Sequence, residues 1–239
     1  MIYIGIDDTD TLETQGTNQL ARMLVARMGM RSHDAMIVRH QLLFDPRVPY
    51  TSHNGSASIL LRSSSHASVE RLIDDLRHGV QSWYVDGSDP GLCVTSDVPA
   101  EVVEFGHRCQ REIIAQDEAR DTAARLGIFL EGLGGTEQGV IGALAAVGLA
   151  SSGNDGRVVH RASWPWPDAL TGPQEIATLY ARGVDEVRCI VTNRSITRGI
   201  VDVGKRLRPN RRGGRIVLFV APAPDSWPAP PFWHALRYH

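Results

Sequence analysis

Three aspartates, Asp7, Asp8 and Asp10, lie within four positions directly after the apolar run Ile2–Ile6. A β-branched run of this length predicts a buried strand. The carboxylates would then lie at its C-terminal end, where α/β sheets usually bind ligands. Oxygen donors without a nearby His or Cys favour Mg²⁺ or Mn²⁺ over zinc, so we predict a magnesium site formed by all three, with Asp8 also catalytic. The same residues also fit an acidic turn in which Asp10 or Thr11 caps the next helix.

A glycine-rich turn, residues 132–139, opens an apolar segment of small residues that predicts a helix buried on all sides. Backbone N–H groups and the dipole at a helix start favour phosphate oxygens. The turn lacks the Gly-Lys-Ser/Thr ending of a Walker A motif, has Glu137 where the Rossmann fingerprint has its third glycine, and is predicted to follow a helix rather than a strand. Close helix–helix packing would explain the same glycines. We predict that the turn binds ATP through Gly134, Gly135, Thr136, Gly139 and Gly142.

Carboxylates that hold a metal and a helix start that holds phosphates are the two halves of a metal–nucleotide site. Together they favour phosphoryl or nucleotidyl transfer, in which the protein positions groups and neutralises charge. Thr17, at the start of the next predicted helix, could offer its hydroxyl to metal or phosphate, and we take it as a second catalytic candidate. An ordinary helix cap is the alternative for Thr17.

Two further regions are candidates for substrate binding. His53, Asn54 and Gly55 follow a proline-containing turn and could place an imidazole and an amide in a cleft, although a lone histidine is more often structural. Residues 194–215 carry eight cations against Asp202 alone. This excess could steer a phosphate-bearing or RNA substrate, with Arg194 and Arg198 as contacts, or it could be a solvated hairpin.

Composition limits the classes of protein that are possible. The chain has 239 residues, 42% hydrophobic residues and a net charge of −2, which excludes a global affinity for polyanions. Its three cysteines are far apart and form no CxxC pair, which argues against a disulfide framework or a zinc ribbon. No apolar run approaches the roughly 18 residues of a membrane span, and no leader precedes the first strand, so we expect a cytoplasmic protein without membrane contact.

The remaining patterns predict alternating helices and strands. A single long helix is expected from Pro99 towards Ala124, and a proline-rich tail that does not fold is expected after residue 222. The other predicted strands are 35–44, 56–62, 91–95, 157–161, 187–192 and 215–221, and the other predicted helices begin at 17, 69 and 175.

Three motifs, in this order, resemble the archaeal tRNA-isoleucine agmatidine synthetase (TiaS) family, which consumes ATP and agmatine to modify an anticodon cytidine. Gly5-Ile-Asp-Asp-Thr-Asp10 is similar to the family's opening Gly-Ile-Asp-Asp-Thr-Asp. Asp45-Pro-Arg-Val-Pro-Tyr50 with Asn54-Gly55 resembles its Asn-Pro-x-Val-Pro-Trp and following Gly-Asn-Gly. Gly139-Val-Ile-Gly-Ala-Leu-Ala-Ala-Val-Gly148 is similar to its Gly-Leu-Ile-Gly-Ala-Leu-Ala-Ala-Ile-Gly.

The resemblance implies a kinase-like domain with an inserted ferredoxin-like domain, and aspartates that hold Mg²⁺ at the ATP phosphates. Thr17 falls where the family has its autophosphorylated threonine, but the family reads Cys-Thr-Thr-Tyr there and this chain reads Gly16-Thr17-Asn18-Gln19. The family's OB-fold and cysteine-based zinc ribbon, which grip the tRNA, are not visible in this sequence.

We therefore predict an α+β protein with a mixed-sheet, kinase-like ATP-binding domain formed by residues 1–56 and 119–222, a ferredoxin-like insertion at 57–118 and a tail at 223–239. The predicted function is Mg²⁺–ATP-dependent phosphoryl transfer to a hydroxyl on a small molecule or an RNA nucleoside, with RNA contacting residues 194–215. The alternative is an ATP-binding sensor or a tRNA-modification accessory protein without turnover of its own.

Overall fold

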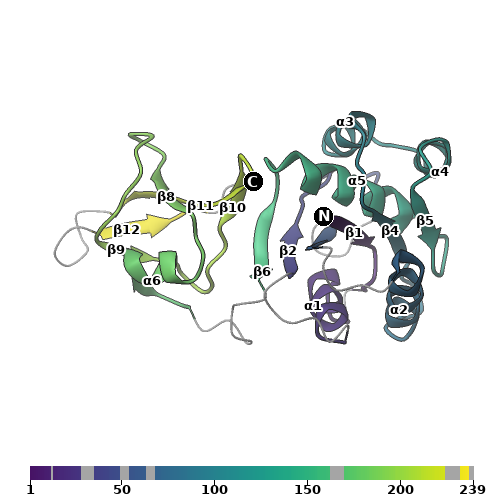
Figure 1. Ribbon diagram of the computed structural model, residues 1–239, viewed down its shortest axis with the longest axis horizontal. Coiled ribbons are helices and arrows are strands. Elements are labelled where there is room, and N and C mark those ends of the chain that lie inside the picture. The colour runs from purple at the N-terminus through teal and green to yellow at the C-terminus, as the bar shows by residue number, and fades with distance from the viewer. Residues whose placement is uncertain are drawn as a thin grey trace.

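The computed structural model describes residues 1–11, 13–27, 35–48, 54–62, 68–161, 170–223 and 232–236. Their strands form one mixed sheet in the order β5-β4-β1-β3-β2-β6-β10-β11-β12-β9-β7, with β8 paired to β11. Figure 1 shows two lobes, an N-terminal lobe in which helices pack on the sheet and a C-terminal lobe made mostly of strands. The predicted mixed α+β class is confirmed at this level.

The elements of the N-terminal lobe surround strand β1. They are β1 Ile2–Asp7, α1 Thr17–Arg27, β2 Ala35–Arg39, β3 Ala57–Leu61, α2 Val69–Gln81, β4 Gly91–Thr95, α3 Ala100–Cys109, α4 Gln116–Arg125, β5 Phe129–Gly132, α5 Gly139–Ser152 and β6 Arg157–Arg161. β1 lies between β3 and β4 and pairs antiparallel with both.

The backbones of β1 and α5 pack closely against each other. This packing places the start of α5 beside the end of β1. Ile2, Ile4 and Ile6 are buried in the same core cluster as the apolar residues of α1 and α2. α5 packs on β1, and a Cβ atom on Gly5 would lie 1.9 Å from the carbonyl oxygen of Ala143. α5 is buried nearly throughout, which confirms the helix predicted to be apolar on all sides.

The elements of the C-terminal lobe centre on β11, which pairs with β8, β10 and β12. They are β7 Pro173–Glu175, α6 Ile176–Ala181, β8 Glu186–Cys189, β9 Ile200–Asp202, β10 Asn210–Arg212, β11 Arg215–Pro222 and β12 Phe232–Ala235. The lobe joins the rest of the sheet through β6, which pairs with β2 along its length and with β10 at Arg157 and Asn210.

The single helix predicted from Pro99 towards Ala124 is wrong, because α3 ends at Cys109 and α4 begins at Gln116. Between them the side chain of Gln110 donates hydrogen bonds to other segments. Ile114, which would lie on a helix surface if the helix continued, instead turns into the core with 7% exposure. The gain from burying this side chain favours the break.

Two predictions about strands are also wrong, and a third is right only in part. The glycine-rich turn follows strand β5, not a helix, because Phe129–Gly132 pair with the edge of β4. Part of the expected tail is a strand, since β12 pairs antiparallel with β11 and parallel with β9. The four residues of β12 follow the last proline, so their N–H groups are free to join the ladder. The predicted strand 35–44 is shorter and ends at Arg39.

The division into a discontinuous domain and an insertion at residues 57–118 stays a prediction. Elements β3, α2, β4 and α3 come from that range, and β3 and β4 flank β1 in the same sheet. Among the described residues, no helix is both long and apolar enough to cross a membrane.

Candidate functional site

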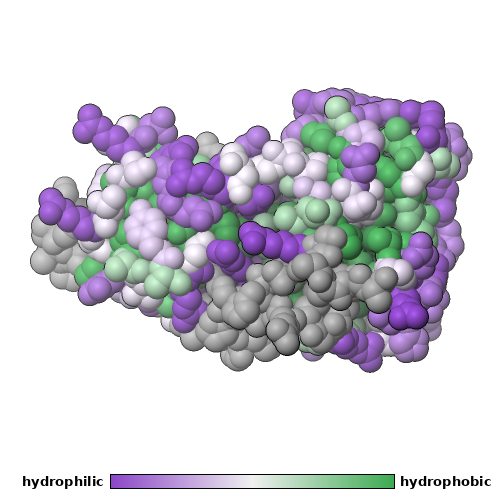
Figure 2. Space-filling view, viewed as in Figure 1, coloured by the Kyte–Doolittle hydropathy of each residue, from purple (hydrophilic) through white to green (hydrophobic). Residues whose placement is uncertain are grey.

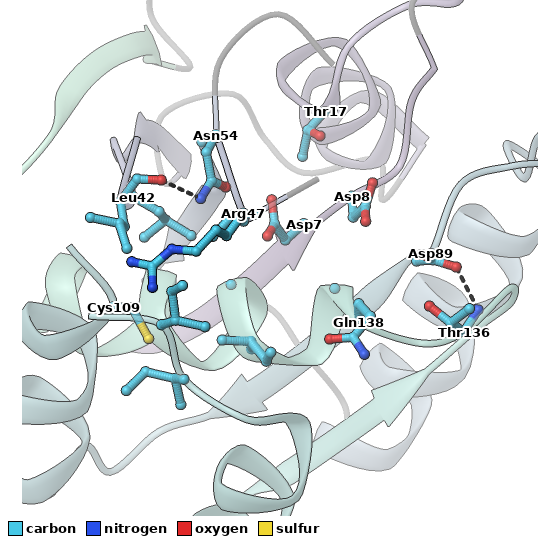
Figure 3. A pocket seen from close by; sticks show the side chains of 18 of the residues that line it. Asp7, Asp8, Thr17, Leu42, Arg47, Asn54, Asp89, Cys109, Thr136 and Gln138 are labelled. Atoms are coloured by element: carbon cyan, nitrogen blue, oxygen red, sulfur yellow. Dashed lines mark hydrogen bonds between the residues drawn. The ribbon is translucent and has the colours of Figure 1, made fainter. Parts of the chain in front are cut away.

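A cavity of about 500 Å³ lies where the C-terminal end of β1 meets the N-terminal end of α5. Figure 3 shows carboxylates at one end, and at the other mostly apolar side chains together with Arg47. The acidic end contains Asp7, Asp8, Asp10, Thr17 and Asp89, and the apolar end is lined by Leu42, Leu43, Val48, Cys109, Ile114 and Ile141.

Asp7 is the last residue of β1, and its carboxylate lies directly against α5. A Cβ atom on Gly142 would be 1.8 Å from Asp7 Oδ2, so only glycine leaves room for this carboxylate. Burial raises the pKa of Asp7 to about 8, and the neighbouring charge of Asp8 adds to the shift. The nearby Arg39 guanidinium opposes this shift without cancelling it.

Asp8 turns the chain out of β1 into the cavity. Its backbone has a φ of 51°, in the left-handed region that aspartate tolerates better than most residues. Its carbonyl oxygen accepts a hydrogen bond from the N–H of Asp89 at 3.1 Å. Burial, followed by the charges of Asp89 and Asp10, raises the pKa of Asp8 to about 6. Asp7 and Asp8 therefore hold protons more readily than ordinary aspartates do.

Thr17 is buried at the first position of α1, and its hydroxyl connects to the acidic end. Thr17 Oγ1 donates to Asp10 Oδ1 at 3.0 Å and accepts from Thr9 Oγ1 at 3.1 Å. Sequence analysis placed Thr17 and the three aspartates together, and the structure brings all four to one cavity.

The glycine-rich turn is folded around a carboxylate of the protein itself. Asp89 accepts a hydrogen bond from the N–H of Thr136, drawn as a dashed line in Figure 3. Its backbone carbonyl accepts from the N–H of Gly139 at 2.9 Å. Gly135 has a φ of +59°, and a Cβ atom there would be 2.0 Å from Asp89 Oδ1. The turn thus has the geometry that holds an anionic oxygen.

The predicted ATP-binding residues fall into two groups, those that line the cavity and those that do not. Thr136, Gly139 and Gly142 line the cavity, whereas Gly134 and Gly135 are outside its lining. Gly134 instead packs beneath the ring of Tyr84, where a Cβ atom would be 2.3 Å from a ring carbon.

Only some of the predicted substrate-binding residues line the cavity. Asn54 and Gly55 line the cavity, and Asn54 Nδ2 donates to the carbonyl oxygen of Leu43 at 2.8 Å. His53 lies outside the described residues. Arg194 and Arg198 are exposed in the segment between β8 and β9 of the C-terminal lobe and do not line the cavity.

Sequence reasoning missed Asp89 and Arg39 as parts of this site. Asp89 directly precedes Pro90, and its distance from Asp8 along the chain hides the contact. Arg39 ends the apolar strand β2, and its guanidinium lies so close to Gly55 that a Cβ atom there would be 2.6 Å from Nη2. A charged residue that ends an otherwise apolar strand was the signal available in the sequence.

A metal ion would find oxygen donors here but not a preassembled cage. Within the described ranges, no three or more His, Cys, Asp or Glu side chains gather as metal ligands. Carboxylates with raised pKa values and a hydroxyl nevertheless match the donors of Mg²⁺, which usually binds one or two carboxylates together with substrate phosphates and water.

The fold and the cavity describe a mixed α+β protein with a cavity, acidic at one end, at the start of a buried helix. No protein-family model matches the chain. Three curated relatives are each called tRNA(Ile2) 2-agmatinylcytidine synthetase TiaS. Those of Pyrococcus horikoshii and Thermococcus sibiricus are 26% and 25% identical over 153 residues, and that of Cenarchaeum symbiosum is 26% identical over 154.

Each alignment covers 62% of this chain but only 33–35% of the relative, so the chain spans about a third of the length of the curated relatives it matches. A solved structure described as a tRNA fluorescent labeling enzyme is 25% identical, with a TM-score of 0.53 over 62% of this chain and 35% of that one. The TiaS–tRNA(Ile2)–ATP complex is 24% identical with the same TM-score, over 62% and 36%, and shows a shared fold. The chain is therefore a partial homologue of TiaS, which confirms the resemblance found in its three motifs.

Proposed function

We propose that the cavity binds ATP with a divalent cation and that the protein transfers a phosphoryl group to a hydroxyl-bearing acceptor. The observation that carries this proposal is a cavity that joins carboxylates, two of them with raised pKa values, to a mostly apolar slot at a helix start. The names of the relatives support it, since one solved neighbour is a complex of TiaS with tRNA(Ile2) and ATP.

In this proposal the triphosphate lies at the acidic end and the adenine in the apolar end. Asp8 and Asp10, with Asp7 behind them, would hold Mg²⁺, which would supply the positive charge that offsets the phosphate oxygens. Gly139 and Gly142 allow the phosphates to approach the start of α5. Thr136 offers its N–H when Asp89 releases it.

Thr17 and Asp10 provide a route for a proton. The hydroxyl of Thr17 already donates to Asp10, and this arrangement prepares a hydroxyl for attack on phosphorus. If Thr17 takes the γ-phosphoryl group, its Oγ–P bond forms as the bond to ADP breaks, and Asp10 receives the hydroxyl proton. Asn54, held by Leu43, would orient the acceptor on the opposite side of the cavity.

The acceptor is a small molecule or an RNA nucleoside, and the C-terminal lobe favours RNA. Residues 170–223 contain ten lysines and arginines against four aspartates and glutamates, although the whole chain has a net charge of −2. In Figure 2 the projecting upper edge of this lobe is hydrophilic. A basic lobe beside an ATP cavity would raise the local concentration of a phosphate-bearing substrate.

The finer fold and location remain part of the proposal. We propose that residues 1–56 and 119–222 form the kinase-like domain, that 57–118 form the ferredoxin-like insertion and that the protein works in the cytoplasm. The ATP-binding sensor or tRNA-modification accessory protein is the competing function, and only turnover separates it from an enzyme.

The deciding experiment is calorimetric titration of ATP into the wild type, Asp8→Ala and Asp74→Ala, each with Mg²⁺ and with EDTA. Asp74 is a matched control because it is an exposed aspartate on α2 that does not line the cavity. We expect binding that requires Mg²⁺, survives Asp74→Ala and weakens at least tenfold in Asp8→Ala. No binding by the wild type under any condition would overturn the proposal.

A second assay separates the enzyme from the sensor. ADP release is measured from Mg²⁺–ATP alone, with tRNA and with a small-metabolite extract, and phosphate on Thr17 is sought by mass spectrometry. ADP release above the background of Asp8→Ala supports an enzyme. Saturable ATP binding without ADP release in any arm supports the sensor.

A further inference from the structure

A hydrogen-bonded chain of side chains lies behind the apolar end of the cavity. His40 Nδ1 is 2.7 Å from Asp155 Oδ1, and His40 Nε2 is 2.9 Å from Ser58 Oγ. The order Ser–His–Asp is that of a nucleophilic triad. Ser58 and His40 are completely buried, however, and neither lines the cavity, so no substrate could reach the hydroxyl.

Asp155 is the acceptor that holds this chain together. Besides His40, it accepts a hydrogen bond from Gln110 Nε2 at 2.9 Å, while its own side chain is only 19% exposed. Removing this carboxylate leaves the buried Nδ1 of His40 without its partner and leaves Gln110 Nε2 with the carbonyl oxygen of Gln41 alone, and stranding a buried polar group is the costly way to break a hydrogen bond.

His40 and Gln110, the partners of Asp155, directly adjoin in sequence one side of the cavity, which we call the cavity wall: residues 41–43, Asn54 and Cys109. Gln110 also donates to the carbonyl oxygen of Gln41 at 3.1 Å. The N–H of Leu42 donates to the carbonyl oxygen of Asn54, and that of Leu43 to the carbonyl oxygen of Cys109, both at 2.9 Å. Through Gln110 and His40, Asp155 therefore ties the end of α3 to the extension of β2.

The loop that carries Asp155, residues 153–156, is fastened on its other side to the β10–β11 hairpin of the C-terminal lobe. The N–H of Gly214 donates to the carbonyl oxygen of Gly153 at 3.1 Å, and that of Arg211 to the carbonyl oxygen of Gly156 at 3.0 Å. The N–H of Gly213 donates to Asn154 Oδ1 at 2.6 Å. The loop thus touches the hairpin with its backbone and Asn154, and the cavity wall with Asp155.

The loop has little freedom to shift towards the cavity wall. Gly156 has a φ of +87°, and a Cβ atom there would be 2.8 Å from His40 Nδ1 and 2.5 Å from a methyl carbon of Val38. A displacement of the hairpin would therefore shift His40.

We propose that Asp155 is a positioning residue, which holds the cavity wall through His40 and Gln110 and makes the shape of the cavity depend on the β10–β11 hairpin. This inference rests on the proposed function only in taking ATP as the ligand of the cavity. The dependence of its wall on Asp155 is a property of the fold that can be measured without ATP.

Cys109 is the reporter, since its thiol lines the cavity and its burial raises its pKa to about 12, so that it reacts slowly. The rate of alkylation of each cysteine by iodoacetamide is measured in the full chain by peptide mass spectrometry. Cys93 is buried in the same hydrophobic cluster as Cys109 but does not line the cavity, and Cys189 is buried in the C-terminal lobe, so the two report general opening of the lobes.

In Asp155→Ala we expect the Cys109 rate to rise about tenfold while the other two rates stay within about twofold. In Asp155→Asn, which keeps an acceptor for His40 but not for Gln110, we expect a smaller rise. Glu131→Ala is the matched control, because it removes another hydrogen-bonded, half-buried carboxylate that neither lines the cavity nor contacts the β10–β11 hairpin, and it should leave Cys109 within about twofold.

Gly214→Pro tests the hairpin, because proline cannot adopt the φ of +73° and lacks the N–H that bonds Gly153. We expect the Cys109 rate to rise about threefold. An unchanged Cys109 rate in both Asp155 variants, or equal rises at all three cysteines, would overturn the positioning role. An unchanged rate in Gly214→Pro would overturn the link to the hairpin.

ATP titration of the same variants shows which proposal has failed. If the wild type does not bind ATP but Cys109 responds as expected, the proposed function fails and the positioning role stands. If ATP binds but the Cys109 rate does not change, the positioning role fails and the proposed function stands.

Discussion

The acidic end of the cavity and the Glu186 cluster of the C-terminal lobe both bury carboxylates, but they treat the charge in opposite ways. Glu186 accepts hydrogen bonds from Arg188 and Ser195, and these bonds lower its pKa to about 2. Burial raises the pKa of Asp7 to about 8, since no comparable partner compensates for the lost water. The difference separates a carboxylate that stabilises the fold from one whose raised pKa is typical of functional sites.

The largest expected effect comes from filling the space in which the Asp7 carboxylate lies. Gly142→Ala would place Cβ 1.8 Å from Asp7 Oδ2, and α5 cannot move away because it is buried against β1. We expect the free energy of unfolding to fall by about 3 kcal/mol, measured by urea denaturation.

Gly79→Ala in α2 is the control, because its Cβ would meet only the flexible end of Leu24. An equal loss in both variants would mean that the tight packing at Asp7 has no special cost.

The next largest effect tests the structural carboxylate. Glu186→Gln weakens its contacts with Arg188 and Arg215, and we expect a loss of about 2 kcal/mol at pH 7, since both arginines are partly exposed. Because the folded pKa lies below the ordinary value of 4.5, the stabilisation is complete above that value and disappears as pH falls towards 2.

Urea denaturation at pH 7, 4.5 and 3 measures this dependence. The wild type and Glu186→Gln should converge in stability as the pH falls. A gap that stays constant down to pH 3 would show that the carboxylate charge is not the stabilising feature.

Asp7→Asn should have a smaller effect of the opposite sign. The folded pKa of Asp7 lies above its ordinary value of 3.8, so its ionisation disfavours the folded state increasingly from about pH 4 to about pH 8. We expect the variant to be more stable than the wild type by about 1 kcal/mol at pH 8.5 and equal to it near pH 3.5.

The same variant should bind Mg²⁺–ATP more weakly in calorimetry, because it lacks one carboxylate of the site. Lower stability at pH 8.5 would show that Asp7 is compensated in the folded protein and would remove the contrast with Glu186.

Local patterns predicted the parts of the site that depend on neighbouring residues. Asp7, Asp8 and Asp10 had to cluster because they follow one buried strand, and α5 had to be buried because it offers no polar face. The contribution of Asp89 was not visible, because it depends on β4 pairing beside β1 and bringing distant segments together.

The mistaken elements share a physical cause. β5 and β12 are four-residue strands, too short for a periodic pattern, and they exist because a neighbouring strand offers its edge. The break between α3 and α4 follows from contacts of Gln110 and Ile114 with segments far along the chain. The separation of Arg194 and Arg198 from the cavity likewise depends on how the lobes are joined.

The close packing of α5 on β1 also dictates the order in which the site can be assembled. The strand that supplies the aspartates and the helix that completes the cavity are separated along the chain by β2 to β5. During synthesis on the ribosome, β1 therefore lacks its packing partner α5 until that helix has emerged. Contacts this distant in sequence slow folding. In the nascent chain the Gly5 face of β1 therefore stays uncovered until α5 arrives, whereas the face of Ile2, Ile4 and Ile6 can pack with α1 and α2 earlier.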